Sequence, residues 1–156
     1  IELRICAEDA SADFRPAIGD ILLLDEPRGE GVRVDSGILD GGKVTTDFDP
    51  MLSKLIVHGR DRDEAIARGR RAAQDYVILG VTTNLSYLDA ILAHPKFCSG
   101  EVSTGFLSEE AEALKQDCDP ASTDILAAAT VLSDARLVKA LEDVPEIYRI
   151  MGNWRN

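Results

Sequence analysis

The chain has 156 residues, of which 45% are hydrophobic and 29% charged, and its formal net charge is −11 at pH 7. A chain of this length fits one compact domain that buries about two thirds of its unfolded surface. The acidic balance, with a sequence pI near 4.5 and no stripe of Lys and Arg side chains, argues against partners such as nucleic acids and anionic membranes.

Membrane insertion and disulfide formation are not predicted. No apolar run reaches the roughly 18 residues that a spanning helix needs, and no basic-then-apolar leader precedes Ile1. Cys6, Cys98 and Cys118 are odd in number and far apart, which favours free thiols in a reducing compartment. The sequence therefore predicts a soluble, cytoplasmic protein.

The first part of the chain is predicted to form short strands. Residues 1–7 (IELRICA) are rich in Ile and Leu, and the turn-rich segment EDASAD follows them. Further stretches of strand length are separated by proline, glycine and a DGG turn signal; they span residues 20–27, 31–37, 43–49 and 51–59. This succession is typical of antiparallel β structure.

A helix is predicted over residues 62–79. Asp61 is suited to be its N-cap, Glu64 completes a capping box, and Gly80 offers a C-terminal cap. Because a glycine inside a helix costs roughly 1 kcal/mol relative to Ala, Gly69 indicates close packing on a sheet. The predicted buried face consists of Ala65, Ile66, Gly69, Ala72, Ala73, Tyr76 and Val77.

More helices are predicted toward the C-terminus. Thr83 or Asn84 is suited to cap a helix over LSYLDAILAHP that Pro95 ends, and FCSGEVSTGFL is expected to be a loop. SEEAEALKQ is predicted as a third helix, and an Ala-rich fourth helix is expected to run through about Ala135. An antiparallel sheet followed by packed helices predicts the α+β class.

Two sequence patterns that resemble ligand sites are better explained as local structure. The segment DGGK lacks the second glycine and the Ser or Thr of a phosphate-binding loop, so residues 41–43 predict a hairpin turn. His94 and Cys98 are four residues apart, but Pro95 breaks the helix that would align them. Since no second ligand pair exists, no metal site is predicted.

Three charged residues leave two interpretations open. Asp47 and Asp49 either form an acidic pair on one side of an extended stretch or accept hydrogen bonds in a turn. Arg4 either pairs with Glu8 and Asp9 at a strand edge or clamps an anion or enolate with its planar, permanently charged guanidinium. Hydrolytic catalysis has no support, because no serine lies in a nucleophile elbow and no triad is visible.

Six stretches occur in a fixed order over about residues 1–107: IELRICAED, FRPAIGDI, PRGEGVRVDSGI, DFDPMLSKLIVHGRDRDEAIARGRRA, GVTTN and F…STGFL. Together they resemble the C-terminal domain of biotin carboxylases, the ATP-grasp subunits or domains of acetyl-CoA, propionyl-CoA, methylcrotonyl-CoA and pyruvate carboxylases. The resemblance implies an α+β fold in which helices pack against a curved antiparallel or mixed sheet, followed by a helical tail.

The resemblance also implies a reaction. Biotin carboxylase uses MgATP to activate bicarbonate as carboxyphosphate, and the biotin enolate then takes up the carboxyl group at N1. Arg4 matches the family's arginine that stabilises the enolate, which implies that Arg4 is catalytic. Biotin, ATP and magnesium are the cofactors of the parent enzyme. Because the ATP-binding elements belong to preceding domains, we expect an N-terminally truncated fragment that binds none of them usefully and is inactive alone.

The loop PRGEGVR matches a loop that helps to build the family's bacterial homodimer. Arg33 coincides with an arginine there, whereas Glu30 stands where some members have an aromatic residue. Burying the Glu30 carboxylate would cost several kcal/mol unless a cation compensates. Glu30 and Arg33 are therefore the predicted subunit-interface residues, with Glu30 arguing against an unchanged dimer surface.

The resemblance assigns residues 1–116 to the biotin carboxylase C-terminal domain and residues 117–156 to a helical extension toward the next domain. The end, YRIMGNWRN, looks like the entry to the middle domain of acyl-CoA carboxylase α subunits. The expected partners are the ATP-grasp lobes of the same polypeptide, a biotinyl carrier domain, a carboxyltransferase subunit and a second copy of the chain. In a eukaryote the expected location is the mitochondrial matrix.

An alternative function is a noncatalytic acidic module that docks into a larger complex. The two functions make different predictions for Arg4. The carboxylase interpretation requires an exposed guanidinium that faces the ATP-grasp domains, whereas the docking interpretation allows a surface salt bridge.

Overall fold

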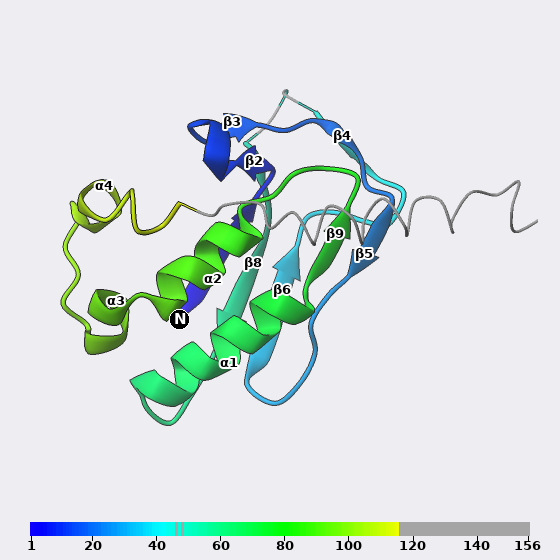
Figure 1. Cartoon of the computed structure of the whole chain (residues 1–156). Helices are drawn as coiled ribbons and strands as arrows, with labels where there is room; N and C mark the ends of the chain where they lie inside the picture. Colours follow the sequence, from blue (N-terminus) through cyan, green and yellow to red (C-terminus); the bar gives the residue numbers. More distant parts are fainter. Residues whose placement is uncertain (46, 48, 116–156) are drawn as a thin grey trace, which may run out of the picture. The chain divides into compact units, whose positions relative to one another are not determined.

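The computed structural model describes residues 1–45, 47 and 49–115 (Figure 1). β1 (Glu2–Cys6), β8 (Met51–Val57) and β6 (Val32–Ser36) form a sheet in the order β1-β8-β6. Three two-stranded pairs accompany it: β2 (Glu8–Asp9) with β3 (Arg15–Pro16), β4 (Gly19–Asp20) with β7 (Lys43–Val44), and β5 (Leu23–Asp25) with β9 (Val77–Leu79). All of these described pairings are antiparallel.

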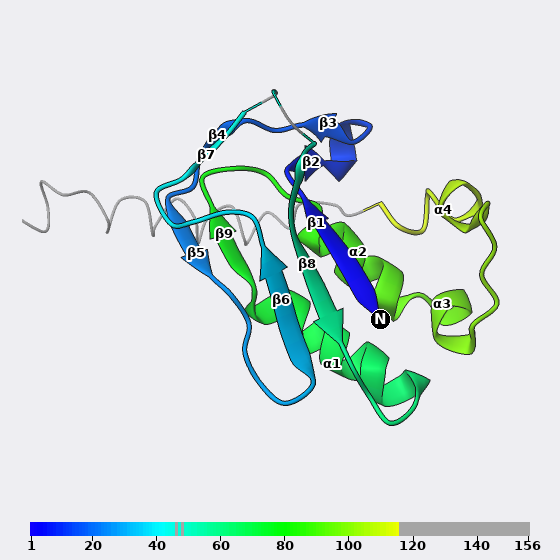
Figure 2. The same cartoon turned by 180° about the vertical axis from the view of Figure 1, so that it is seen from behind.

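The helices of the described residues are η1 (Ala10–Ala12), α1 (Arg62–Asp75), α2 (Leu85–Ala93), α3 (Pro95–Ser99) and α4 (Phe106–Glu109). In Figure 1 α1 and α2 lie in front of the sheet, and in Figure 2 the strands of the sheet lie in front of them. The two helices therefore cover one face of the sheet, and the α+β prediction is confirmed. No described helix is long and apolar enough to cross a membrane.

The core lies between the sheet and the two long helices. Strand alternation directs every second residue of β1 toward the helices, so Leu3 and Ile5 are buried while Arg4 is exposed. A Cβ on Gly69 would lie 3.2 Å from Leu92 and 3.3 Å from Val57, which confirms the close packing predicted for this glycine. Other buried members of the core are Ile21, Leu55, Ile66, Ala72, Ala73, Tyr76 and Ile78.

The predicted start of α1 is confirmed, but its predicted end is wrong. The Asp61 carboxylate accepts a hydrogen bond from Glu64 N at 2.8 Å, as expected of the N-cap. The Glu64 side chain differs from the predicted capping box, because its Oε2 accepts from Arg60 N at 2.7 Å and not from the backbone N of the N-cap Asp61. The helix ends at Asp75, and residues 77–79 form β9 instead. These residues pair with β5, and this tertiary pairing outweighs their periodicity.

Two strand predictions need correction in length. Residues 20–27 do not form one strand, because β4 ends at Asp20 and β5 begins at Leu23. Of the described residues between 43 and 49, only Lys43 and Val44 form a strand, β7. Both changes follow from the change of pairing partner, since β4 pairs with β7 and β5 pairs with β9.

The region after α2 is more helical than predicted near Pro95 and less helical near SEEAEALKQ. Pro95 begins α3 at a position where its missing N–H costs nothing, so the loop prediction is wrong there. The third predicted helix is largely wrong: among its described residues only Ser108 and Glu109 are helical, as the end of α4, which starts at Phe106. Lys96 and His94 both pair with the Glu110 carboxylate just beyond that end. The fourth predicted helix lies outside the described residues.

Candidate functional site

Arg4 occupies the open face of the three-stranded sheet. It stands between buried Leu3 and Ile5 on β1, and its side chain is 73% exposed. Its Nε lies 3.4 Å from Oε1 of Glu2 on the same strand. Such an exposed pair contributes little, so the planar fork of the guanidinium is free to bind an anion. Of the two interpretations left open for Arg4, the salt bridge with Glu8 and Asp9 does not form: Arg4 pairs with Glu2, and the Asp9 carboxylate accepts hydrogen bonds from Ser11.

A row of charged side chains crosses the open face. The strand register places Arg4 opposite Lys54 of β8, and Lys54 opposite Asp35 of β6. The Lys54 ammonium lies 3.9 Å from the Asp35 carboxylate. Each cation has a carboxylate beside it, Glu2 beside Arg4 and Asp35 beside Lys54, so the open face carries charges of both signs. Sequence reasoning missed Lys54, because the register between two strands far apart in the chain has no local signal.

The backbone around Arg4 is held on both edges of β1. β8 pairs with one edge, and Asn84, just before α2, bonds the other. Asn84 Nδ2 donates to Arg4 O at 3.1 Å, and Cys6 N donates to Asn84 Oδ1 at 2.9 Å. Asn84 was considered as a helix cap, but its side chain makes no capping bond. In the sequence, the helix-cap pattern and the GVTTN segment of the resemblance both mark this stretch, and neither predicts the bonds to β1.

Cys6 lies next to the site but is poorly suited to be a nucleophile. Burial raises the pKa of its thiol, and the negative charges of Glu8 and Asp49 raise it further, with Arg4 partly offsetting them. A raised pKa keeps the thiol protonated at neutral pH, and the thiolate is the reactive form. Cys6 and Cys98 are free cysteines, and Cys118 lies outside the described residues.

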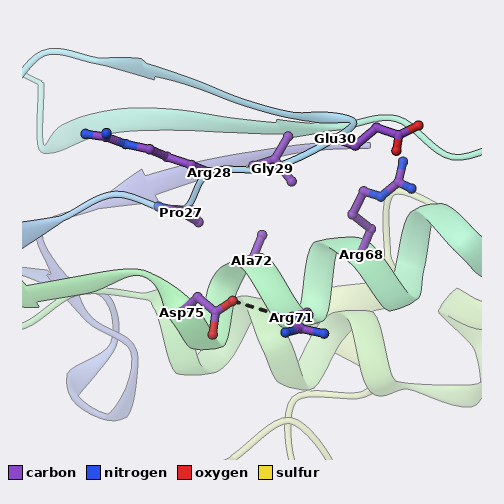
Figure 3. A pocket seen from close by; sticks show the side chains of 9 residues that line it. Pro27, Arg28, Gly29, Glu30, Arg68, Arg71, Ala72 and Asp75 are labelled. Atoms are coloured by element: carbon purple, nitrogen blue, oxygen red, sulfur yellow. Dashed lines mark ion pairs between the residues drawn. The ribbon is translucent and has the colours of Figure 1, made fainter.

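The two predicted interface residues have different surroundings. Glu30 lines a pocket of about 270 Å³ between the loop before β6 and α1, where Figure 3 shows its carboxylate near the Arg68 side chain. Arg33 instead donates two hydrogen bonds of 2.8 Å to Asp35, its neighbour on the open face. The pocket is lined by Pro27, Arg28, Gly29, Glu30, Val32, Arg68, Arg71, Ala72 and Asp75.

The weaker candidate sites have local structural roles. Asp49 accepts a hydrogen bond from Met51 N at 2.8 Å, which is the turn-acceptor role. Residues 41–43 include the predicted turn, with Gly41 at φ +73, but the strands on either side of it do not pair with each other. His94 Nε2 faces Glu110 while Cys98 Sγ contacts Leu92 O. No group of three or more His, Cys, Asp and Glu in the described part could hold a metal ion.

Removing the Arg33 guanidinium is expected to raise the pKa of Asp35. Hydrogen bonds from Arg33 hold that pKa below its usual value. Because the pKa of Asp35 is lower in the folded state than in the unfolded state, its ionised carboxylate stabilises the fold at pH values above the unfolded-state pKa of about 4. This stabilisation is lost as the pH falls through the folded-state pKa. With Arg33→Met, the folded-state pKa of Asp35 lies closer to its unfolded-state pKa. The part of the pH dependence of the unfolding free energy that comes from Asp35 is therefore expected to be smaller.

Carboxyl ¹³C NMR titration of the chain measures this effect. Arg71→Met is the matched control, because Arg71 pairs with Asp75 at 3.7 Å and not with Asp35. The control leaves the pKa of Asp35 unchanged. An equal titration of Asp35 with and without Arg33 would contradict the bidentate pairing.

The chain is similar to known proteins of one family along most of its length. Residues 2–109 match the family model described as the biotin carboxylase C-terminal domain. The chain is 36% identical to the mitochondrial methylcrotonoyl-CoA carboxylase subunit alpha of Dictyostelium discoideum, over 99% of this chain and 23% of that protein. It is 44% identical to biotin carboxylase 1 of Bacillus subtilis, over 69% of this chain and 24% of that protein.

A solved structure shows the same similarity in three dimensions. The biotin carboxylase domain of Hydrogenobacter thermophilus 2-oxoglutarate carboxylase, a dimer in complex with MgADP and bicarbonate, superposes with a TM-score of 0.72 at 33% identity. The match covers 75% of this chain and 26% of that one. The chain thus spans about a quarter of the length of each of these relatives.

Proposed function

Because the chain belongs to the family of biotin carboxylase C-terminal domains, we propose that it completes the biotin-carboxylating site of a biotin-dependent carboxylase. In this proposal the ATP-grasp lobes lie elsewhere in the same polypeptide and Arg4 supplies a catalytic guanidinium. The observation that carries it is the placement of Arg4 on the open, charged face of the sheet. There the guanidinium is accessible to a substrate held by neighbouring lobes.

Arg4 acts through its fixed positive charge. When a base in the ATP-grasp lobes takes the N1 proton of biotin and N1 attacks the carbon dioxide that carboxyphosphate releases together with phosphate, negative charge develops on the ureido oxygen. A guanidinium held beside that oxygen lowers the barrier because its charge requires no reorganisation during the reaction. Lys54, opposite Arg4 on β8, is a second cation on the same face, with Asp35 beside it.

ATP and magnesium are assigned to the rest of the complete enzyme. MgATP supplies the activation of bicarbonate. The described residues contain no cluster of His, Cys, Asp and Glu suited to a metal ion, so we propose no magnesium ligand among them. In this proposal the chain alone is a scaffold with one catalytic side chain, and the groups that activate bicarbonate belong to the ATP-grasp lobes.

We propose an acyl-CoA carboxylase α subunit as the parent protein. The methylcrotonoyl-CoA carboxylase subunit aligns along 99% of this chain, including the segment after residue 116. The Bacillus biotin carboxylase aligns with only 69% of this chain. Such a parent would hand carboxybiotin on a biotinyl carrier domain to a carboxyltransferase subunit. The acceptor would be an acyl-CoA.

A homodimer interface through the loop of Glu30 and the start of β6 is also a proposal. Both Glu30 and Arg33 are exposed, so a second subunit can reach them. Burial of Glu30 requires a compensating cation, and Arg68 and Arg71 line the same pocket. These arginines provide the positive charge that compensates a buried Glu30 carboxylate. An aromatic residue at position 30 carries no charge and would need no such compensation.

Biotin-dependent ADP release tests the proposed function. The complete protein, given ATP, magnesium and bicarbonate, is expected to release ADP faster when free biotin is added. The 156-residue chain under the same conditions is expected to release none. No response of the complete protein to biotin would reject the carboxylase function and favour the docking module, and turnover by the chain alone would overturn its assignment as scaffold.

A further inference from the structure

One residue, Asn84, bonds the outer edge of β1 at Arg4 and Cys6. β1 is an edge strand of the sheet, so the backbone N–H and C=O groups that point away from β8 need other partners. Asn84 supplies three of them: its Nδ2 donates to Arg4 O, its Oδ1 accepts from Cys6 N, and its backbone N donates to Cys6 O at 3.1 Å. The side-chain amide thus binds the strand as a neighbouring peptide group would.

These bonds lie where β1 and β8 change register. Ile5 pairs with Ser53, but Cys6 pairs with Met51, so the ladder is irregular one residue after Arg4. A bulge bends and twists its strand and re-aims the side chains beside it. Asn84 bonds one residue before the irregularity and one after it, which fixes the strand direction at the position of Arg4.

Asn84 is itself rigidly held. It is only 8% exposed, and its carbonyl accepts a hydrogen bond from Leu88 N at 3.0 Å in the first turn of α2. A buried amide with both its donor and its acceptor used is costly to replace. The clamp therefore connects the strand of Arg4 to α2, an element packed in the core.

We propose that Asn84 is a positioning residue for Arg4, acting through the backbone of β1 to set where the guanidinium meets the substrate. The inference rests on the proposed catalytic role of Arg4. The side chain of Asn84 bonds backbone atoms of Arg4 and Cys6, so its effect on the reaction is indirect. A displacement of about 1 Å can cost about a hundredfold in rate, so loss of the clamp is expected to be visible in turnover.

A double-mutant cycle on the complete enzyme tests this coupling. Biotin-dependent ADP release is measured for Arg4→Ala, Asn84→Ala and the double variant, with biotin-independent ADP release as a second readout. We expect Asn84→Ala to lower the biotin-dependent kcat about tenfold or more and to lower the biotin-independent rate by a smaller factor. In the Arg4→Ala background the same substitution is expected to have less than about a twofold effect, because interacting residues are not additive.

Asn84→Asp separates positioning from folding. The carboxylate still accepts from Cys6 N, but its second oxygen faces Arg4 O without a proton to donate. Burial raises the pKa of a carboxyl group, and the protonated form regains the donor. The activity of this variant relative to the unchanged enzyme is therefore expected to rise between about pH 8 and about pH 6.

Tyr76→Phe is the control for a lost buried hydrogen bond. It removes the 2.9 Å bond between Tyr76 and Ser53 without touching the outer edge of β1, and kcat is expected to stay within about twofold. Independent, additive effects of Arg4 and Asn84 would overturn the positioning role, as would an unchanged kcat of both Asn84 variants. If Arg4→Ala itself has no effect, the proposed function of Arg4 fails instead.

Discussion

Arg4→Ala is expected to lower biotin-dependent ADP release by the complete enzyme about a hundredfold. Removal of one preorganised group that stabilises developing negative charge typically has an effect of this size. The fold is expected to survive, because the Arg4 side chain is 73% exposed and its partner Glu2 is a weakly bound surface group. The loss should therefore appear in kcat with an unchanged melting temperature.

Two further substitutions show whether charge or geometry matters at this position. Arg4→Lys keeps a positive charge but loses the planar fork, so it is expected to recover only part of the rate. Glu2→Gln is the matched control, since it removes the contact of 3.4 Å and leaves the guanidinium in place, and its rate is expected within about twofold of the unchanged enzyme. Full activity of Arg4→Ala would make the open face a scaffold and support the docking function.

Local sequence signals were sufficient where the structure is local. Alternation in β1 and the capping box at Asp61 predicted one strand and one helix start correctly, because both depend on residues within four positions of each other. The role of Arg4 was different: composition favoured a salt bridge, and only the family resemblance suggested catalysis. Its catalytic role is still a prediction.

The errors arose where distant segments decide the outcome. Residues 77–79 continue an apolar helical pattern, yet they pair with β5, which is more than fifty positions earlier in the chain. Asn84 has a good helix-capping sequence, but its side chain bonds β1 at a separation of 78 and 80 positions. A pattern within one segment cannot contain either partner, so both features required the folded chain.

Gly80→Ala is expected to destabilise the chain by about 3 kcal/mol or more. Gly80 has φ +107, a backbone conformation that residues with a Cβ rarely adopt. A Cβ at this position would lie 2.0 Å from the carbonyl oxygen of Asp20 and 3.0 Å from Leu22 N. Both contacts involve backbone, so relief requires β4 or β5 to move.

Gly41→Ala isolates the conformational part of this cost. Gly41 has φ +73, but a Cβ there would have no atom within 4 Å, so a loss of about 1 kcal/mol is expected. Urea unfolding of the chain, followed by circular dichroism, measures both variants. Equal midpoints for the two substitutions would show that the close approach of Gly80 to Asp20 does not constrain the fold.

Gly80 also bears on the site through the order of the chain. It follows β9 directly and precedes Asn84 by four residues. The short connection that passes close to β4 at Gly80 therefore also places the Asn84 side-chain amide beside β1. Displacement of this connection would loosen the Asn84 clamp as well as the β5–β9 pair. In the complete enzyme, a Gly80→Ala variant that still folds is therefore expected to lose biotin-dependent kcat, whereas Gly41→Ala is expected to retain it.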